Sequence, residues 1–313
     1  MKRILALLLA VTCTMGTLCA CGGATSGSGS AANDETSSFT NDDHDNSITV
    51  GIAQDLDESL DPYTITAAGT REVLFNIYEG LFKTGPDGEL IPAVAEKYTT
   101  SADGLTYTFT LRDGVRFHNG NAVTAEDVIY SIKRCADNEG SAIDSSLVSA
   151  FSVISDVQAT DDKTVVLTLK QPDLELLNFL TAAIVPANYD KLDTEPCGTG
   201  PFKFSSRSVK ENFVIEKFDE YWGTPASLSK VTFQVYDDST ALVNALQSGA
   251  VDLCSKLTSA QTAQLSDRYT ILEGTMNLVQ AVYLNNNAAP FDNEKVRQAL
   301  CYAVDVDAML ELT

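Results

Sequence analysis

From Ile48 onward the apolar residues follow two different periods in turn, and this alternation restricts the chain to a mixture of strands and helices. The stretch TYTFTLRDGVRF (106–117) alternates apolar and polar residues, as expected for a half-buried strand followed by a turn at its Asp-Gly pair. The stretch AEDVIYSIKRC (125–135) has the helical period, and Thr124 followed by Asp127 predicts a capping box at its start. We therefore expect an α/β protein.

The same criteria predict the remaining elements, and no segment repeats another. Strands are expected at 48–52, 152–157, 165–169, 202–205, 213–218 and 231–236, with one more ending near Tyr283. Helices are expected at 69–83, 174–180, 241–247 and 293–312. The chain from Ile48 is long enough for one large or two ordinary domains.

The first residues predict an export signal. A short basic end precedes the apolar run Ile4–Val11, which is too short to cross a bilayer. Residues 18–21, LCAC, resemble a bacterial lipobox, in which the last cysteine is diacylated and becomes the first residue of the mature protein. We expect a signal peptide at 1–20 and a lipid on Cys21. A secretory signal cleaved without lipid attachment is the alternative.

Residues 22–47 predict a disordered tether. They are rich in Gly, Ser and Asp and contain almost nothing to bury, so they would span roughly 25–30 Å as a flexible coil. A tether of this length would lift a folded domain off the membrane to which the lipid holds it.

The charge of the chain argues against nucleic acid as a partner. The formal net charge is −22 at pH 7, and a surface with this excess of carboxylates repels phosphate backbones. An acidic exported protein is more simply interpreted as one kept soluble by its charge, with some attraction for cationic solutes.

The reactive side chains give little support to the hypothesis that the protein is an enzyme. The two histidines, His44 and His118, are far apart, so we expect no histidine-based metal site and no cofactor. A Ser-His-Asp or Cys-His hydrolase would have to use His118, and GxSxG, HExxH and CxxC are all absent from the sequence. Four cysteines after Cys21 allow up to two disulfides, with buried free thiols as the alternative: Cys135, Cys197, Cys254 and Cys301.

The stretch CGTGPFKF (197–204) has three interpretations: a phosphate-binding loop, a redox site, or a bend. A phosphate loop needs Lys directly after the second glycine, whereas Pro201 follows Gly200 here. A redox site would need a second cysteine near Cys197. Because glycine permits unusual backbone angles and proline keeps the residue before it out of the helical region, we predict a sharp entry into a strand at Phe202.

Several stretches in a fixed order resemble one family. They are SLDPYTITAAGTREVLFNIYEGLF, GELIPAVAEKYTTSADGLTYTFTLRDGVRFHNGNAVTAEDVIYSIKR, CGTGPFKF, FDEYWG, LQSGAVDL and LNNNAAPFDNEKVRQALCYAVDVD. Together they resemble the bacterial extracellular solute-binding proteins of the oligopeptide and dipeptide class, which supply ABC importers. The resemblance implies a binding protein rather than an enzyme, at the outer face of the cytoplasmic membrane, with a permease as partner and a peptide as ligand.

The resemblance also implies a two-lobed fold of the periplasmic-binding-protein type. The first lobe would consist of 48–91 and 198–289, and an inserted subdomain of 92–197 would pack on its side. Residues 290–313 would begin a second lobe, so the sequence looks truncated in comparison with family members. Arg297 and Asp305 would have structural roles within that second lobe.

Candidate ligand contacts come from the same resemblance. Those in the first lobe would be Thr66, Ala67, Ala68, Ser255, Asn277 and Leu278. Small residues and backbone groups suit a site that pairs with a peptide main chain and tolerates many side chains. Charged groups of the second lobe would hold the ligand's termini.

Four aromatic residues are weaker candidates for the ligand site, and core packing is the alternative for each: Tyr63, Tyr78, Trp222 and Tyr283. Other solutes, such as a nickel complex or a sugar, remain alternatives to a peptide, although the scarcity of histidine weighs against a metal. A secreted hydrolase and a fragment that binds nothing are the remaining alternatives to a solute-binding protein.

Overall fold

The computed structural model describes residues 46–136, 142–265, 268–274, 281–305 and 308. Its largest sheet joins the start of the described chain to segments far along the sequence. The strand order is β11-β1-β10-β9-β8. These strands are β1 (Ser47–Ile52), β8 (Phe202–Ser208), β9 (Asn212–Lys217), β10 (Lys230–Val235) and β11 (Leu253–Cys254). Strand β1 runs parallel to both β10 and β11. The strand order shows that the chain leaves this sheet after β1 and returns to it at β8.

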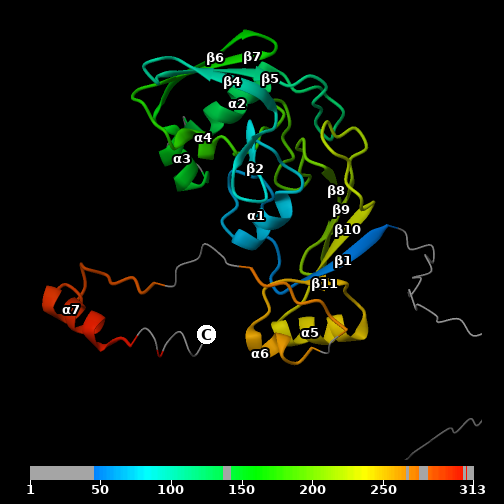
Figure 1. Cartoon of the computed structure of the whole chain (residues 1–313), viewed down its shortest axis with the longest axis vertical. Coiled ribbons are helices and arrows are strands. Elements are labelled where there is room, and N and C mark those ends of the chain that lie inside the picture. Colours follow the sequence, from blue (N-terminus) through cyan, green and yellow to red (C-terminus); the bar gives the residue numbers. More distant parts are fainter. Residues whose placement is uncertain (1–45, 137–141, 266–267, 275–280, 306–307, 309–313) are drawn as a thin grey trace, which may run out of the picture. The chain divides into compact units, whose positions relative to one another are not determined.

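A second, antiparallel sheet is formed within the intervening segment (Figure 1). Its strand order is β4-β5-β7-β6, and a short pair, β2-β3, precedes it. These strands are β2 (Phe82–Thr84), β3 (Leu90–Pro92), β4 (Ala95–Thr100), β5 (Thr106–Leu111), β6 (Ile154–Asp161) and β7 (Thr164–Leu169). Alternate residues of β5 and β7 are buried, which confirms the predicted period of two.

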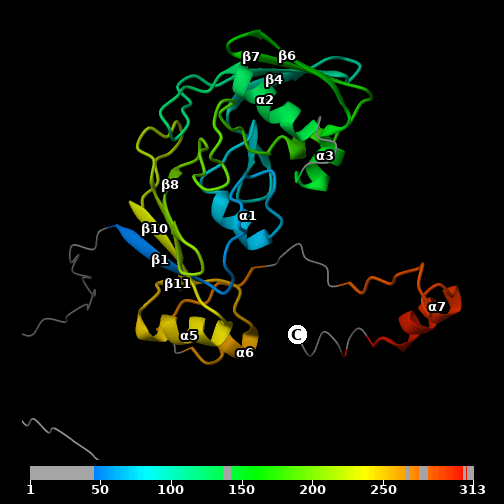
Figure 2. The same ribbon diagram turned by 180° about the vertical axis from the view of Figure 1, so that it is seen from behind.

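The described helices are short. They are α1 (Ala68–Leu74), α2 (Ala125–Ala136), α3 (Ser145–Phe151), α4 (Leu176–Phe179), α5 (Ser239–Ser248), α6 (Ser259–Thr262) and α7 (Glu294–Ala303). Helix α2 packs against β6 and β7 of the second sheet, and α5 packs against β1 and β11 of the first (Figures 1 and 2). The first turn of α2 is fixed as the sequence predicts, because the Asp127 carboxylate accepts from the Thr124 backbone N–H at 2.9 Å.

The helix predicted at 69–83 is wrong in length, since α1 ends at Leu74. The carbonyl groups that would continue the helix are used elsewhere. The Asn76 and Ile77 oxygens accept from the backbone N–H groups of Phe202 and Gly200, at 3.1 and 2.9 Å. Ile77 is nevertheless buried, through a turn rather than a helical face, which explains why its apolar spacing resembled a helix.

Most other predicted elements are confirmed, and a few are corrected. The strands at 48–52, 165–169, 213–218 and 231–236 and the helix at 241–247 are present within one or two residues, whereas β6 begins later than expected and α4 is shorter than expected. The strand expected before Tyr283 falls largely on 275–280, outside the described residues, and 281–285 form no strand. The last helix stops at Ala303.

The four described cysteines are free, so the disulfide alternative is wrong. The alternative of buried free thiols is confirmed for Cys135 and Cys197, whereas Cys254 is half-buried and Cys301 is exposed. Cys135 and Cys197 are buried in the main apolar core, where burial raises the pKa of Cys135 to about 12. A thiol held neutral in this way is inert, as a core residue requires.

The CGTG stretch is a close-packed bend, as its sequence predicts. A Cβ atom at Gly200 would lie 2.6 Å from the Asn76 oxygen, and one at Gly198 would overlap the Ile77 oxygen. Strand β8 starts directly afterwards, at Phe202. The glycines are therefore needed for the approach of one backbone to another.

Replacing Gly198 with alanine should destabilise the fold by roughly 2–3 kcal/mol, because the new methyl group has backbone rather than a flexible side chain in its way. Urea denaturation measures the free energy of unfolding of the variant and of wild type. Gly274→Ala is the matched control, since no described atom lies within 4 Å of its Cβ position. Equal stability of the two variants would contradict the assignment of this bend as a packing constraint.

Candidate functional site

A pocket of about 320 Å³ lies between α1, α3 and α4 and the loops before and after them. Its volume is at the lower end of the range for small-molecule sites, which suits one or two amino-acid residues. Its lining combines aromatic and aliphatic side chains with a few polar groups: Pro62, Tyr63, Ile65, Arg71, Leu74, Phe75, Tyr78, Asp144, Ser146, Leu147, Asn178, Phe179, Thr181, Ala182 and Ala183.

Two tyrosines at this pocket present ring carbon rather than hydroxyl groups. The Tyr63 hydroxyl donates to the Ala183 oxygen at 2.6 Å, and the Tyr78 hydroxyl donates to the Leu60 oxygen at 3.4 Å. Burial raises the pKa of both hydroxyls well above the ordinary value, so they stay neutral. With 1% of Tyr63 exposed, these residues form the base of the pocket and belong to the core as much as to the site.

Phe75 is an exposed part of the pocket wall. It caps the C-terminus of α1, and 60% of it is exposed, which is unusual for so large an apolar side chain. Phe179 and Leu147, from α4 and from α3, provide further apolar lining and are partly exposed. This part of the surface can therefore gain free energy by covering apolar atoms of a ligand.

The charged groups of the pocket form one ion pair. Arg71 Nη2 donates to an oxygen of Asp144 and, at 3.0 Å, to the Ile65 backbone oxygen. Asp144 is the N-cap of α3, and its other oxygen accepts from the Ser146 backbone N–H at 2.8 Å and from the Ser146 hydroxyl at 2.6 Å. These bonds from Ser146, together with Arg71, lower the pKa of Asp144.

The predicted contacts Thr66, Ala67 and Ala68 lie at the N-terminal end of α1, beside the pocket but not among its lining residues. The Asp57 carboxylate fixes this segment by accepting from the backbone N–H groups of Thr66 and Ala67, both at 3.0 Å. The side chains of Thr66 and Ala68 are exposed. They are therefore available to a ligand, and their role as contacts stays a prediction.

Ser255 is exposed and directly follows β11. The next residue, Lys256, has the left-handed φ of 62°, and its Nζ lies 2.9 Å from the Glu72 carboxylate of α1. This ion pair brings the segment of Ser255 beside the helix that carries Ala68. The other two predicted contacts, Asn277 and Leu278, lie outside the described residues, as does the predicted lipid attachment site Cys21.

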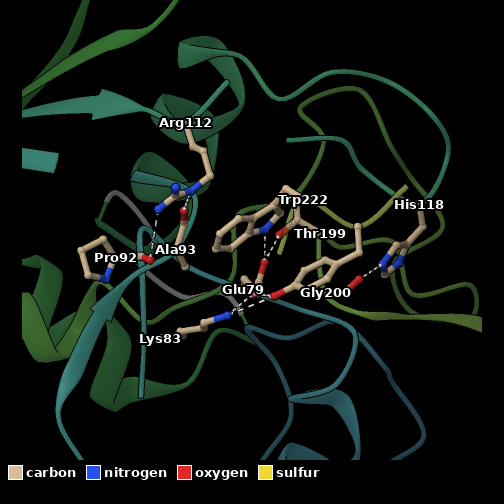
Figure 3. A network of polar contacts seen from close by, with 10 residues as sticks. Glu79, Lys83, Pro92, Ala93, Arg112, His118, Thr199, Gly200 and Trp222 are labelled. Atoms are coloured by element: carbon tan, nitrogen blue, oxygen red, sulfur yellow. Dashed lines mark hydrogen bonds and ion pairs between the residues drawn. The ribbon is translucent and has the colours of Figure 1, made fainter. Parts of the chain in front are cut away.

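Trp222 belongs to a different cluster, centred on the buried Glu79 (Figure 3). The Glu79 carboxylate accepts from Trp222 Nε1 at 2.7 Å, from the Tyr221 hydroxyl at 2.7 Å and from the Thr199 hydroxyl at 3.3 Å. Lys83 Nζ lies 3.2 Å from the same carboxylate. The core alternative is therefore the better description of Trp222, because its polar edge is occupied by Glu79.

The last aromatic candidate, Tyr283, is 94% exposed and is not among the residues that line the pocket. Arg297 donates to the Phe291 oxygen at 2.7 Å, which ties the first turn of α7 to the preceding loop. No helix in the part of the chain that the structure describes is both long and apolar enough to cross a membrane. Among those same residues, no group of three metal-ligating side chains comes together.

His118 is held by hydrogen bonds to the CGTG bend. Its Nδ1 accepts from the Gly198 N–H at 3.3 Å, so its Nε2 carries the proton and donates to the Gly200 oxygen at 3.0 Å (Figure 3). The ring also packs edge-on against Phe218. Burial lowers the pKa of His118 to about 4, and the imidazole therefore stays neutral.

Comparison with known proteins agrees with this arrangement. Residues 89–313 match the model of the bacterial extracellular solute-binding proteins, family 5, middle region. The chain therefore belongs to this family of binding proteins, which are not enzymes, and the predicted resemblance is confirmed. The hydrolase alternative is therefore wrong, because the family consists of binding proteins.

Individual relatives share the fold over most of this chain. The glutathione-binding protein GsiB of Pectobacterium atrosepticum is 33% identical over 266 residues, which are 81% of this chain and 51% of GsiB. The structure of DppA from Helicobacter pylori with the peptide STSA aligns with a TM-score of 0.74 and 27% identity, over 85% of this chain and 58% of DppA.

A third relative binds a different solute. AgaA of A. tumefaciens R10, solved with agropinic acid, is 34% identical with a TM-score of 0.62, over 66% of this chain and 43% of AgaA. The α/β fold of a periplasmic binding protein is thus confirmed, and the chain spans about half the length of the curated relatives it matches.

The pocket includes residues that sequence patterns did not indicate. Arg71 was expected only as one position of a helix, and α3, which supplies Asp144 and Leu147, was not predicted at all. One signal was present, because Asp144 followed by Ser145 and Ser146 is a typical start of a helix. The pairing of Asp144 with Arg71 depends on tertiary structure and has no local signal.

The pKa of His118 makes stability depend on pH in a defined direction. Between pH 6.5 and about 4 the unfolded chain binds a proton that the folded chain does not. The contribution of the neutral ring is therefore intact above pH 6.5 and is lost as the pH falls toward 4, by about 3 kcal/mol in total.

We expect His118→Gln to remove the pH-dependent contribution of the neutral imidazole. The difference in free energy of unfolding between wild type and variant should therefore narrow by about 3 kcal/mol from pH 7.5 to pH 4. Urea denaturation at both pH values measures the difference, and the many carboxylates affect both proteins alike. The control is His44→Gln, which should follow wild type. A difference that stays constant with pH would show that His118 titrates normally.

Proposed function

We propose that the chain is part of a lipid-anchored solute-binding protein that captures peptide-like solutes for an ABC importer. The pocket beside α1 carries this proposal. It has the size and the mixed lining of a small-ligand site, and it adjoins the segment Thr66–Ala68, which the family resemblance places in the ligand cleft and in which Thr66 and Ala68 are exposed.

Peptide-like chemistry is favoured by the lining of the pocket. Apolar walls with one ion pair and a few amide and hydroxyl groups suit a ligand that has both a charge and an apolar side chain. Relatives point the same way, since GsiB is named for binding glutathione and DppA was solved with a peptide. A nickel complex or a sugar is less well matched by these walls.

The mechanism would be closure of two lobes around the ligand. The sheet formed by β1 and β8–β11 would belong to the first lobe (48–91 and 198–289), and the sheet of β4–β7 to the inserted subdomain (92–197). Residues from 290 onward would begin the second lobe. A ligand that contacts both lobes favours the closed state, which the permease would then bind.

A panel of ligands tests the proposed function. We expect saturation-transfer NMR on the full chain to detect di- to tetrapeptides at least tenfold more strongly than glucose or the nickel–histidine complex, with bound peptides displaced by one another, because only peptides match both the ion pair and the apolar walls. Equal signals for all solutes, or signals for none, would contradict peptide capture.

Removal of the anchor is a separate test. Because Cys21 ends the predicted lipobox and precedes a polar tether, Cys21→Ser should release the protein from membranes, and metabolic labelling with a fatty acid should disappear. Cys301→Ser serves as the control, since a cysteine elsewhere in the chain should not affect labelling. Full membrane retention of the Cys21 variant, with unchanged labelling, would refute the anchor.

A further inference from the structure

Arg71 has more hydrogen-bonding capacity to spare at the pocket than its partner Asp144, which already accepts three hydrogen bonds. The two bonds of the guanidinium, to Asp144 and to the Ile65 oxygen, both come from Nη2. Its Nη1 and Nε donate to no described residue, and a guanidinium has five N–H donors in all. Asp144, in contrast, accepts on both oxygens, from Ser146 and from Arg71.

The side chains of Arg71 and Asp144 also differ in their exposure to solvent. The Arg71 side chain is 49% exposed, and the Asp144 side chain is 16% exposed. A ligand that enters the pocket therefore finds more of the cation than of the anion exposed, because Asp144 is largely covered and already accepts three hydrogen bonds. The groups left free are the Nη1 and Nε N–H donors, and the ligand group that complements a charged donor best is an anionic oxygen, which in a peptide-like ligand belongs to a carboxylate.

Asp144 can hold Arg71 in place without using its Nη1 and Nε donors. The Asp144 carboxylate is fixed at the start of α3 by two bonds from Ser146, and the Ile65 oxygen fixes the same Nη2 from the side of α1. A guanidinium held at two points loses less side-chain entropy when it binds a ligand than a free arginine would. Asp144 is in this sense a positioning residue.

Apolar surface lines the same pocket as Arg71. Phe75 is four residues after Arg71, which places the two side chains on one side of α1 and its C-cap, and both line the pocket together with Phe179 and Leu147. If a ligand carboxylate bound Arg71, an adjacent apolar side chain of the same ligand could therefore reach this apolar wall.

We propose that Arg71 binds a carboxylate of the peptide-like ligand and that the adjoining apolar wall, including Phe75, receives an apolar side chain next to that carboxylate. This assignment rests on the proposed function and places one recognition element for ligand charge in the first lobe. The sequence resemblance had led us to expect such charges only from the second lobe. The carboxylate can belong to the C-terminus or to an acidic side chain.

The test uses four peptide probes on the full chain, with apparent Kd values from ligand-observed NMR titrations into the millimolar range. Ala-Ala-Phe has a terminal carboxylate, its amide has none, and Ala-Glu-Phe amide has the carboxylate on a side chain. Ala-Ala-Gly lacks the apolar side chain. We expect wild type to bind Ala-Ala-Phe about tenfold more tightly than its amide, as one charge-assisted contact at a half-exposed site would give.

Variants assign that preference to residues. Arg71→Gln should bring the ratio of acid to amide close to one, and Arg71→Lys should retain part of it, because lysine keeps the charge but not the fixed, planar set of N–H donors. Phe75→Ala should leave this ratio unchanged and reduce the preference for Ala-Ala-Phe over Ala-Ala-Gly. The matched control is Arg116→Gln, since Arg116 is 46% exposed, pairs with Glu220 and does not line the pocket. Thermal melts of each variant establish that it is folded.

The outcomes separate this proposal from the proposed function. If wild type binds the peptides but does not distinguish acid from amide, or if folded Arg71→Gln and Arg71→Lys keep the wild-type ratio, the role of Arg71 is overturned and peptide capture stands. If no peptide binds at any concentration, both fail together. A preference for Ala-Glu-Phe amide over Ala-Ala-Phe would support Arg71 and identify the carboxylate as that of a side chain.

Discussion

The buried carboxylate of Glu79 is the interaction on which the arrangement of the described chain depends. A buried charge is tolerated only when it is paired and hydrogen-bonded, and Glu79 has Lys83 as its counterion and donors from two other segments, Thr199 and the Tyr221–Trp222 turn. The indole of Trp222 lies in turn under the Lys83 ammonium and the Arg112 guanidinium, at 4.9 and 4.3 Å. One side chain thus fixes the exit from α1, the start of β8 and the loop after β9.

This fixed region also explains the extent to which the fold follows from sequence. Strands with a strict period of two, such as β5 and β7, were predictable because one face of each is buried. The end of α1 was not predictable, because the carbonyl groups of Asn76 and Ile77 bond to a segment more than a hundred residues later. Competition between a helix and a distant backbone leaves no mark on local spacing.

The candidate site was less predictable than the fold, for a related reason. Motifs in a fixed order indicated the family and the segment Thr66–Ala68, since these are linear features. The pocket itself is made by α1, α3 and α4 together, and its ion pair joins Arg71 to Asp144 across the tertiary structure. The strength of a linear signal therefore says little about which side chains meet a ligand.

The ion pair between Arg71 and Asp144 matters for ligand binding because the chain as a whole is strongly acidic. A chain with a formal charge of −22 repels an anionic ligand at a distance, but salt screens exposed charges beyond about 8 Å, so capture is decided by the groups a ligand can touch. At the pocket the proposed group is Arg71, which is half exposed and which Asp144 holds in place through their ion pair. Selectivity for a carboxylate would then follow from the free N–H donors of one fixed guanidinium that lines the pocket together with apolar side chains, in a protein whose overall charge is strongly negative.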